Sequence, residues 1–240
     1  MEEKEFKEKL KEKVQKLEVN ITQNQLEQFW QYMNVLLQWN QKMNLTAIVE
    51  PQEIILKHFI DSLTIIKEIK EEQRIIDVGT GAGFPGIPLK IVKPTLSITL
   101  MDSLNKRITF LQEVVKTLKL EKIELIHARA EELARTKEHR EQYDIAVSRA
   151  VAPLNVLLEY LVPFLKVGGE AICMKAASIE KETEEGNKAL EVLNCEIKEK
   201  KEFSLVDTDI QRTILVILKK KQTKECYPRK AGTPKTKPII

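Results

Sequence analysis

Residues 74–86 read RIIDVGTGAGFPG, and the fold prediction starts from this stretch. Residues 75–78 have the length and apolar composition of a buried strand, and residues 85–92 have the pattern of a helix. Glycines lie around the junction, at positions 79, 81, 83 and 86. Glycine lacks a Cβ atom, so the backbone can turn tightly there and approach a ligand. The free N–H groups at the start of the helix suit an anionic group. The stretch therefore predicts a strand–turn–helix unit with a ligand site at its turn.

Strand and helix patterns alternate along the rest of the chain. Further strands are predicted at 96–101, 123–127, 144–148, 171–175, 195–205 and 212–219, and helices at 106–118, 131–141, 153–166 and 179–193. We expect helix 153–166 to end at Gly168 and Gly169, and the last two strands to flank a turn at 207–209. Repeated β–α units form a mainly parallel sheet with helices on both faces. The prediction is a Rossmann-like α/β fold, in which ligands bind at the carboxyl ends of the strands.

Residues 1–70 are predicted to be helical. Thr22 and Gln25 have the spacing of a capping box. Pro51 suits the first turn of a further helix. That helix has an apolar stripe, expected to pack in the core, formed by Ile54, Ile55, His58, Phe59 and Leu63. The helix predicted over 2–16 is mostly charged, so we expect it to lie exposed.

Composition indicates a globular protein, with 42% hydrophobic and 31% charged residues. Cys173, Cys195 and Cys226 have neither the pattern of a disulfide framework nor a zinc-ligand spacing. The first residues contain no apolar signal segment, and no stretch approaches the roughly 18 apolar residues of a membrane helix. We therefore expect a cytoplasmic protein with reduced thiols, no metal and no membrane contact.

Positive charge gathers near the C-terminus. Residues 219–240 contain eight Lys or Arg residues and one acid, Glu225, although the net charge of the chain is only +3. A basic tail on an acidic body suggests a polyanionic partner, and a purely solubilising tail would explain the same charge.

The glycine turn matches two cofactor patterns. Gly79-x-Gly81-x-Gly83 is typical of S-adenosylmethionine sites, and Gly81-x-Gly83-x-x-Gly86 has the spacing of a dinucleotide site. Asp102, at the end of the next strand, suits ribose hydroxyls in either case. The acid Asp77 before the glycines favours S-adenosylmethionine, because a carboxylate suits a sulfonium or ammonium group better than a pyrophosphate. The dinucleotide pattern also begins late after the strand. A class I methyltransferase fold is the favoured prediction.

Two more strand ends carry candidate residues. After the third strand come residues 128–131 (ARAE), where a backbone N–H and a carboxylate are expected to contact an adenine edge. After the fourth strand, Arg149 lies in the loop that should face the transferred methyl group. A surface salt bridge is the alternative role for Arg149.

Longer motifs make the chain resemble the glucose-inhibited division protein B (GidB) family, the bacterial 16S rRNA guanine-N7 methyltransferases. They occur at residues 39–46 (WNQKMNLT), 58–63 (HFIDSL), 77–89 (DVGTGAGFPGIPL), 102–107 (DSLNKR), 148–150 (SRA) and 227–234 (YPRKAGTP). The resemblance implies cofactor contacts through Gly79, Phe84, Ala130, Glu131 and Arg149, with Asp102 and Ser103 near the ribose. It also implies methylation of one guanine in the decoding region of 16S rRNA.

We accordingly predict a helical extension at 1–70, a methyltransferase domain at 71–220 and a basic tail at 221–240. Contacts with 16S rRNA or the small ribosomal subunit are expected from Lys106, Arg107, Arg229 and Lys230, and the protein is expected to be a monomer. No catalytic residue is assigned, because guanine N7 carries a lone pair and no proton, so correct positioning is enough. His58, His127 and His139 show no metal-ligand spacing and are interpreted as structural or surface residues.

Other functions fit parts of the pattern. A nicotinamide-dependent oxidoreductase fits the second glycine spacing. A methyltransferase for another RNA or a small molecule fits the first spacing, and a non-catalytic RNA-binding module fits the basic tail.

Overall fold

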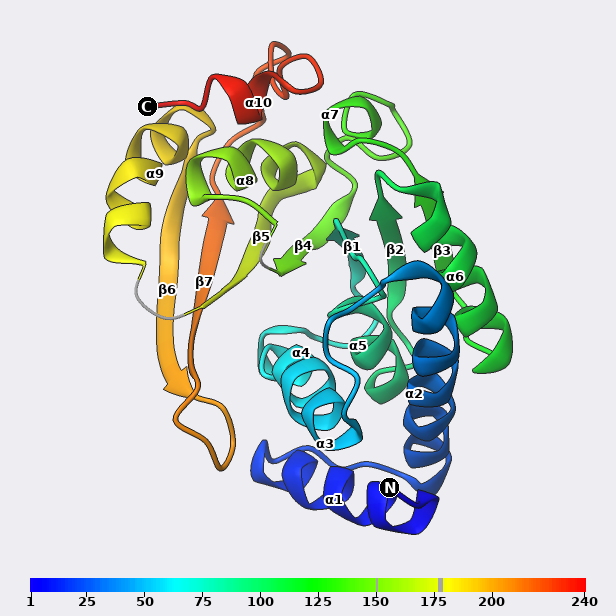
Figure 1. The fold of residues 1–240 in the computed structure, drawn as a ribbon. Coiled ribbons are helices and arrows are strands. Elements are labelled where there is room, and N and C mark those ends of the chain that lie inside the picture. The colour runs from blue at the N-terminus through cyan, green and yellow to red at the C-terminus, as the bar shows by residue number, and fades with distance from the viewer. Residues whose placement is uncertain (150, 177–178) are drawn as a thin grey trace.

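The computed structural model describes residues 1–149, 151–176 and 179–240, and its centre is a seven-stranded sheet (Figure 1). The strands are β1 (Arg74–Val78), β2 (Ser97–Asp102), β3 (Ile123–His127), β4 (Tyr143–Arg149), β5 (Leu165–Lys175), β6 (Cys195–Ser204) and β7 (Gln211–Lys219). Their order is β3-β2-β1-β4-β5-β7-β6. Neighbouring strands from β3 to β5 are parallel, and β7 pairs antiparallel with both β5 and β6. This confirms the predicted mainly parallel sheet.

The order of the strands shows where in the sheet a ligand should bind. From β1 the chain moves outward to β2 and β3, then returns to the other side of β1 as β4. The strand order therefore reverses between β1 and β4, and the loops after these strands diverge to open a crevice. Because Val78 pairs with Met101, β1 and β2 end at the same level. The glycine turn and Asp102 are thus neighbours.

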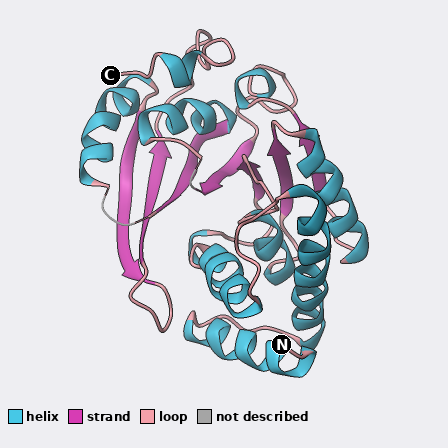
Figure 2. Ribbon diagram, in the orientation of Figure 1, coloured by secondary structure: helices cyan, strands magenta, loops and turns pink. Residues whose placement is uncertain are grey.

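Helices cover both faces of the sheet (Figure 2). Ile75 packs in one apolar cluster with α5 (Gly86–Val92) and α6 (Asn105–Thr117). The next residue, Ile76, packs in a second cluster with α8 (Leu154–Leu161) and α9 (Glu180–Val192). Successive strand side chains point to opposite faces, so each buried strand supplies both clusters.

The N-terminal helices belong to the first cluster. They are α1 (Glu3–Lys16), α2 (Gln23–Met43), α3 (Pro51–Ile54), a π-helix (Ile55–Ile60), α4 (Asp61–Leu63) and a short 3₁₀ turn (Ile66–Glu68). The capping box of Thr22 and Gln25 is confirmed, as is burial of the stripe that follows Pro51. The hydroxyl of Tyr32 donates to the carbonyl of Ala82, so α2 supports the glycine turn.

The prediction that the first helix lies exposed is confirmed for most of its charged residues, but it missed a buried stripe. Phe6, Leu10 and Val14 of α1 are fully buried. They lie at a spacing of four residues, which places them on one stripe of the helix. The charged majority of α1 conceals this narrow apolar stripe in the sequence.

Two predicted helices are shorter in the structure. α7 covers only Ala130–Leu133, and the following turn is closed by the Thr136 hydroxyl, which donates to the Leu133 carbonyl. The predicted helix 153–166 ends at Leu161, because Pro163 has no N–H for a helical hydrogen bond. Consequently β5 begins at Leu165, and Gly168 and Gly169 lie within this strand.

The basic C-terminal segment packs against the protein body. It contains α10 (Thr233–Thr236) and the buried side chain of Ile239. The guanidinium of Arg140 donates to the carbonyls of Thr223 and Tyr227, both at 2.9 Å. Within the described parts of the chain, no helix has the length and apolarity to cross a membrane.

Candidate functional site

A cavity of about 420 Å³ lies at the carboxyl ends of β1 and β2. Five residues predicted to contact the cofactor line it, from three strand ends: Gly79, Phe84, Asp102, Ser103 and Arg149. Thr46 and His58, from the N-terminal region, complete its wall. The fold thus brings most of the predicted cofactor contacts to one place.

The glycine turn leaves space for a ligand above its backbone. Gly81 has a φ of +62°, in the left-handed region that favours glycine. A Cβ atom built on Gly81 would have no other atom within 4 Å, so this part of the turn faces open space. At Gly79 (φ +73°) the same atom would lie 2.9 Å from Val151, so the turn is closely packed on that side.

Asp77 lies beneath the turn rather than in the cavity. Its carboxylate is fully buried and accepts hydrogen bonds from the Thr80 hydroxyl at 2.7 Å and the Gly86 N–H at 2.9 Å. Burial raises the pKa of Asp77 to about 6, although both hydrogen bonds oppose this change. Asp77 is not among the residues that line the cavity, and its second carboxylate oxygen, Oδ1, has no hydrogen-bond partner among the described residues. That Asp77 faces the charged part of the cofactor stays a prediction. Asp77 ties the turn to the start of α5.

Asp102 is buried at the end of β2 and organises the opposite wall. Its carboxylate accepts hydrogen bonds from the N–H groups of Gly81 at 3.0 Å and Leu104 at 2.9 Å. The guanidinium of Arg107 also pairs with it, at 3.0 Å. Arg107, predicted to contact RNA, thus has a carboxylate partner in the wall of the cavity. The acid predicted from strand spacing lies directly beside the glycine turn.

An aromatic and cationic cluster forms the remaining wall. The rings of His58 and Phe84 stack with centroids 4.4 Å apart, and the Arg149 guanidinium lies 5.0 Å from the centre of the Phe84 ring. One nitrogen of His58, Nε2, lies 2.9 Å from the Thr46 hydroxyl, and the other, Nδ1, lies 3.3 Å from Arg149. Arginine can only donate, so Nδ1 accepts and carries no proton.

Burial and the neighbouring Arg149 determine the charge state of His58. Burial, and secondarily the positive charge of Arg149, lowers the pKa of His58 to about 3. His58 is therefore neutral near pH 7, and its lone pair at Nδ1 is occupied by Arg149. It is a positioned wall residue and a poor general base.

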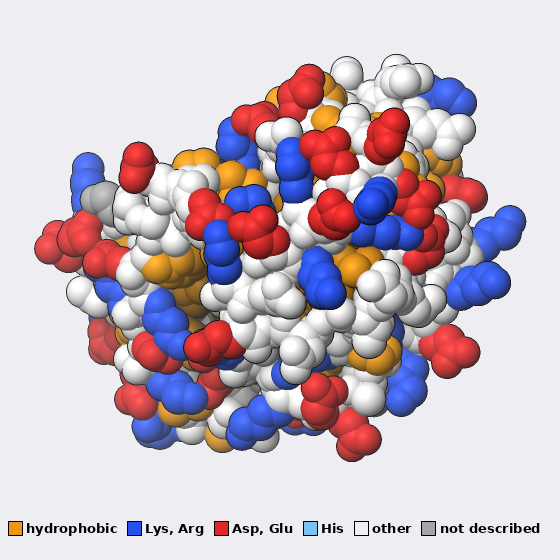
Figure 3. Space-filling model, turned by 90° about the horizontal axis from the view of Figure 1, so that it is seen from below, with side chains coloured by type: hydrophobic (Ala, Val, Ile, Leu, Met, Phe, Trp, Pro, Cys, Tyr) orange, Lys and Arg blue, Asp and Glu red, His pale blue; other side chains and the backbone are white. Residues whose placement is uncertain are grey.

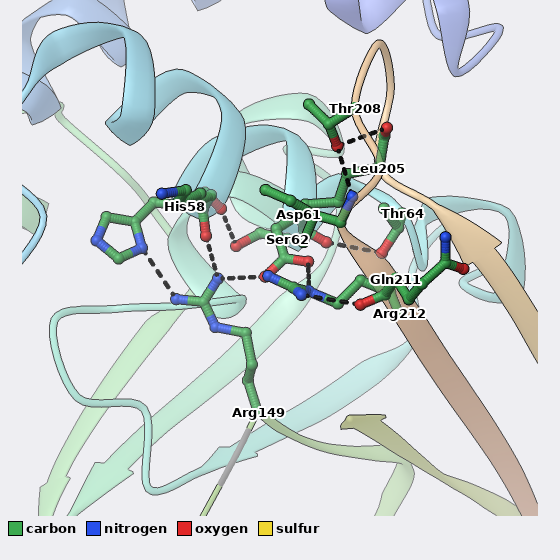
Figure 4. A network of polar contacts seen from close by, with 11 residues as sticks. His58, Asp61, Ser62, Thr64, Arg149, Leu205, Thr208, Gln211 and Arg212 are labelled. Carbon is green, nitrogen blue, oxygen red and sulfur yellow. Dashed lines mark hydrogen bonds and ion pairs between the residues drawn. The ribbon is translucent and has the colours of Figure 1, made fainter. Parts of the chain in front are cut away.

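A buried carboxylate holds Arg149 from behind (Figure 4). Asp61 accepts a hydrogen bond from Arg149 at 3.1 Å and another from Arg212 of β7 at 2.8 Å. The Lys57 carbonyl accepts a third bond, also from Arg149, at 3.2 Å. The sequence indicated neither Asp61 nor Arg212 as site residues. His58 and Asp61 lie three residues apart in the sequence and both contact Arg149, so their closeness was the local signal available.

The adenine contacts predicted at Ala130 and Glu131 lie outside the lining of this cavity. Glu131 is buried, and its carboxylate accepts a hydrogen bond at 2.8 Å from the N–H of Gly232 in the C-terminal segment. Arg229, predicted to contact RNA, pairs instead with the fully buried Glu159 at 2.7 Å. Lys106 and Lys230 are exposed.

The described residues contain no group of three or more His, Cys, Asp or Glu side chains arranged to hold a metal ion. The three cysteines are not bonded to one another. Burial raises the pKa of both Cys173 and Cys195 to about 12, so neither is a thiolate near pH 7.

The sheet order, the glycine turn after β1 and the acid at the end of β2 define a class I S-adenosylmethionine-dependent methyltransferase. Solved structures agree on the fold. The protein is similar to a SAM-dependent methyltransferase from Aquifex aeolicus (TM-score 0.52, 18% identity, 70% of this chain and 94% of that one). It is also similar to TYW2 of M. jannaschii in complex with AdoMet (TM-score 0.51, 19% identity, 65% of this chain and 74% of that one).

Sequence comparison identifies the family. Residues 25–214 match GidB, described as rRNA small subunit methyltransferase G. Proteins named ribosomal RNA small subunit methyltransferase G are similar over nearly the whole chain. The protein of Alkaliphilus metalliredigens is 53% identical, covering 96% of this chain and 97% of its own length. That of Acetivibrio thermocellus is 54% identical, covering 92% and 91%. The chain belongs to the rRNA small subunit methyltransferase G family. The dinucleotide interpretation of Gly81–Gly86 is therefore set aside.

Proposed function

We propose that the protein transfers the methyl group of S-adenosylmethionine to N7 of one guanine in the decoding region of 16S rRNA. The observation that carries this proposal is the identity of about half over almost the full length of relatives named for small-subunit rRNA. The relatives' names support small-subunit rRNA as the substrate. The chemistry of the site supports guanine N7 as the atom that accepts the methyl group.

The cavity fits the cofactor. The open space above Gly81 is a cradle that any Cβ atom would enter, and Asp102 and Ser103 lie beside it for the ribose hydroxyls. Gly79, Phe84 and Arg149 would complete the contacts, with Ala130 and Glu131 toward the adenine. S-adenosylmethionine supplies an electrophilic methyl group when it is bound.

The residues around the cavity support direct attack by an unprotonated nitrogen. Guanine N7 has no proton to lose, so the reaction needs no general base. His58, the ionisable group best placed to be one, is neutral and engaged with Arg149. The described residues that line the cavity include no cysteine that could form a covalent intermediate. The side chains therefore act by positioning the reactants and by presenting fixed dipoles.

We further propose how the chain is divided and where it works. Residues 1–70 act as a helical extension, 71–220 as the methyltransferase domain and 221–240 as a basic segment. The protein acts as a monomer in the cytoplasm on 16S rRNA or the small subunit. Exposed Lys106 and Lys230 are the stronger candidates for phosphate contacts, because Arg107 and Arg229 already have carboxylate partners.

Transfer of a labelled methyl group onto small subunits that lack the modification tests the proposal. The expected result is label in 7-methylguanosine at a single position, identified by nuclease digestion and mass spectrometry. Label in a different base, at an exocyclic amine, or in free small molecules only would overturn it. Calorimetry with S-adenosylmethionine and NADH in parallel checks the cofactor independently of the RNA.

A further inference from the structure

A second cavity, of about 280 Å³, lies on the other side of the wall formed by His58 and Arg149. Those two residues line both cavities. The second one lies at the carboxyl ends of β4 and β5, next to the start of β7. In a parallel sheet this is the same edge that carries the cofactor cavity. The two cavities therefore adjoin across one layer of side chains.

Basic side chains dominate the lining of the second cavity. They come from four separate elements: Lys57, Arg149, Lys175 and Arg212. Asp61 is the one carboxylate among the described lining residues, and it is shared between the two arginines. Two arginines around one carboxylate leave a surplus of positive charge in a partly enclosed space, where charge attracts more strongly than on an open surface.

The donors of Arg212 are not all used. Its Nε bonds to Asp61 at 2.8 Å and its Nη1 to the Gln211 carbonyl at 3.0 Å, and its Nη2 donates to no described residue. Lys57 pairs with Glu53, which lies outside the cavity lining. Such half-exposed pairs are weak, so the Lys57 ammonium can exchange partners. Ile48 and Met174 add an apolar patch to the lining.

We propose that this second cavity binds the phosphodiester of the acceptor nucleotide, through Arg212 and Lys57. The proposal rests on the proposed function and deepens it. Arginine and lysine donors are the usual partners of RNA phosphate groups. A phosphate held here places its own base at the shared wall of His58 and Arg149, facing the cofactor cavity. Asp61 then has a positioning role, since it fixes Arg149 and Arg212 relative to each other.

Binding of a decoding-region rRNA fragment to the protein without cofactor tests this inference. Fluorescence anisotropy is measured for Lys57→Gln, Arg212→Gln and Arg212→Lys. Lys67→Gln is the matched control, because Lys67 also pairs with a glutamate, Glu18, and does not line the cavity. The two Gln variants are expected to weaken RNA binding about tenfold. The slope of log affinity against log salt should fall by about 0.7 for each phosphate group that the variant no longer binds.

Further measurements separate the possible outcomes. Arg212→Lys should recover part of the affinity, and Lys57→Gln should keep the S-adenosylmethionine affinity of the unmodified protein. In turnover assays KM for RNA should rise while kcat is largely kept. Unchanged RNA affinity and salt slope in both Gln variants would overturn the inference, even if the protein methylates rRNA normally. Absence of methyl transfer by the unmodified protein would instead overturn the proposed function.

Discussion

An alanine at position 81 would place a methyl group in the open space of the cofactor cavity, since Gly81 lines that cavity with a φ of +62°. Gly168 in β5 is a matched control: its φ is +84°, an added Cβ also meets no atom within 4 Å, and it lies outside the cavity. Left-handed backbone costs a non-glycine residue about 1–2 kcal/mol. Both alanine variants should lose this much stability in urea denaturation.

Only Gly81→Ala should also weaken S-adenosylmethionine binding, by about tenfold or more in calorimetry, which corresponds to about 1.4 kcal/mol. If Gly168→Ala weakened binding equally, general strain would explain the effect. If Gly81→Ala bound the cofactor normally, the cradle assigned to this turn would be misplaced.

His58 makes stability depend on pH in a predictable direction. Its pKa is about 3 in the folded protein and about 6.5 ordinarily. As the pH falls below 6.5 the unfolded chain takes up a proton that the folded protein does not, so stability is lost until the pH approaches 3. His58→Gln removes this loss, by up to about 1.4 kcal/mol for each pH unit. Urea denaturation of both proteins at pH 7.5 and pH 5 measures the difference.

Asp77 should change stability with pH in the direction opposite to His58, so it provides a second test of the same linkage. Its pKa is raised from 3.8 to about 6, so the folded protein takes up the proton first as the pH falls through 6. This proton uptake favours the folded state between pH 6 and pH 4. Relative to Asp77→Asn, the unmodified protein should therefore gain stability over that interval. A decrease in stability there would contradict the assigned burial of the carboxylate.

At the scale of elements, α1 is attached by its narrow apolar stripe. Leu10 is fully buried, so Leu10→Ala should cost about 2–5 kcal/mol, because apolar packing is removed and a residual cavity is left. Lys11 is exposed one residue further along, and Lys11→Ala should change stability by less than about 0.5 kcal/mol. Equal effects of the two substitutions in chemical denaturation would show that α1 is not held by this stripe.

The C-terminal segment is anchored by two buried carboxylates on the helices it covers. Glu159 of α8 receives the N–H and the guanidinium of Arg229, and Glu131 of α7 receives the N–H of Gly232. Removing one partner of a buried ion pair is strongly destabilising. Glu159→Gln should therefore speed hydrogen exchange across 229–240 and lower Tm.

An exposed pair provides the control for this anchor. Glu191 pairs with Lys188 on the surface of α9, and Glu191→Gln should leave both Tm and exchange of the C-terminal segment unchanged. If Glu159→Gln also weakened cofactor binding, the segment would be coupled to the adenine side of the site through α7. Normal exchange in Glu159→Gln would mean that other contacts hold the segment.

At the scale of the whole molecule, one apolar cluster joins the N-terminal helices to the sheet. Phe6, Phe59 and Ile75 all belong to it. A shared core of this kind favours cooperative unfolding. We therefore expect far-ultraviolet circular dichroism and tryptophan fluorescence to report a single coincident transition, because both tryptophans, Trp30 and Trp39, lie in α2. An earlier fluorescence transition would show that residues 1–70 unfold separately.

One face of the molecule shows how charged side chains are distributed. The face in Figure 3, seen from below the view of Figure 1, mixes acidic and basic side chains without a continuous basic area. A mixed surface of this kind offers RNA little net attraction. The clustered basic side chains of the second cavity, Arg149 and Arg212 among them, are a stronger attraction for a polyanion than this face.

The parts of the fold that could be predicted depend on nearby residues. The strands at 75–78 and 123–127, the capping box at Thr22 and the closing hairpin all have local patterns, and all are confirmed. The errors also have local causes. Pro163 was a visible reason to end the helix before 166. In the region after α7, Arg140 donates to carbonyls 83 and 87 residues further along the chain, and local patterns do not reveal such contacts.

A strand, a glycine turn and an acid at the next strand end predicted a nucleotide-cofactor site from about thirty neighbouring residues. The longer motifs along the chain, and not this turn alone, distinguished a methyltransferase from a dinucleotide-binding enzyme. The positions of the charged groups around the two cavities follow from the tertiary structure. Asp77 turns inward, while Asp61 reaches Arg149 and Arg212 across separations of 88 and 151 residues. Local spacing carries no record of such distant pairs, since they form only when the helices and the sheet close over one core.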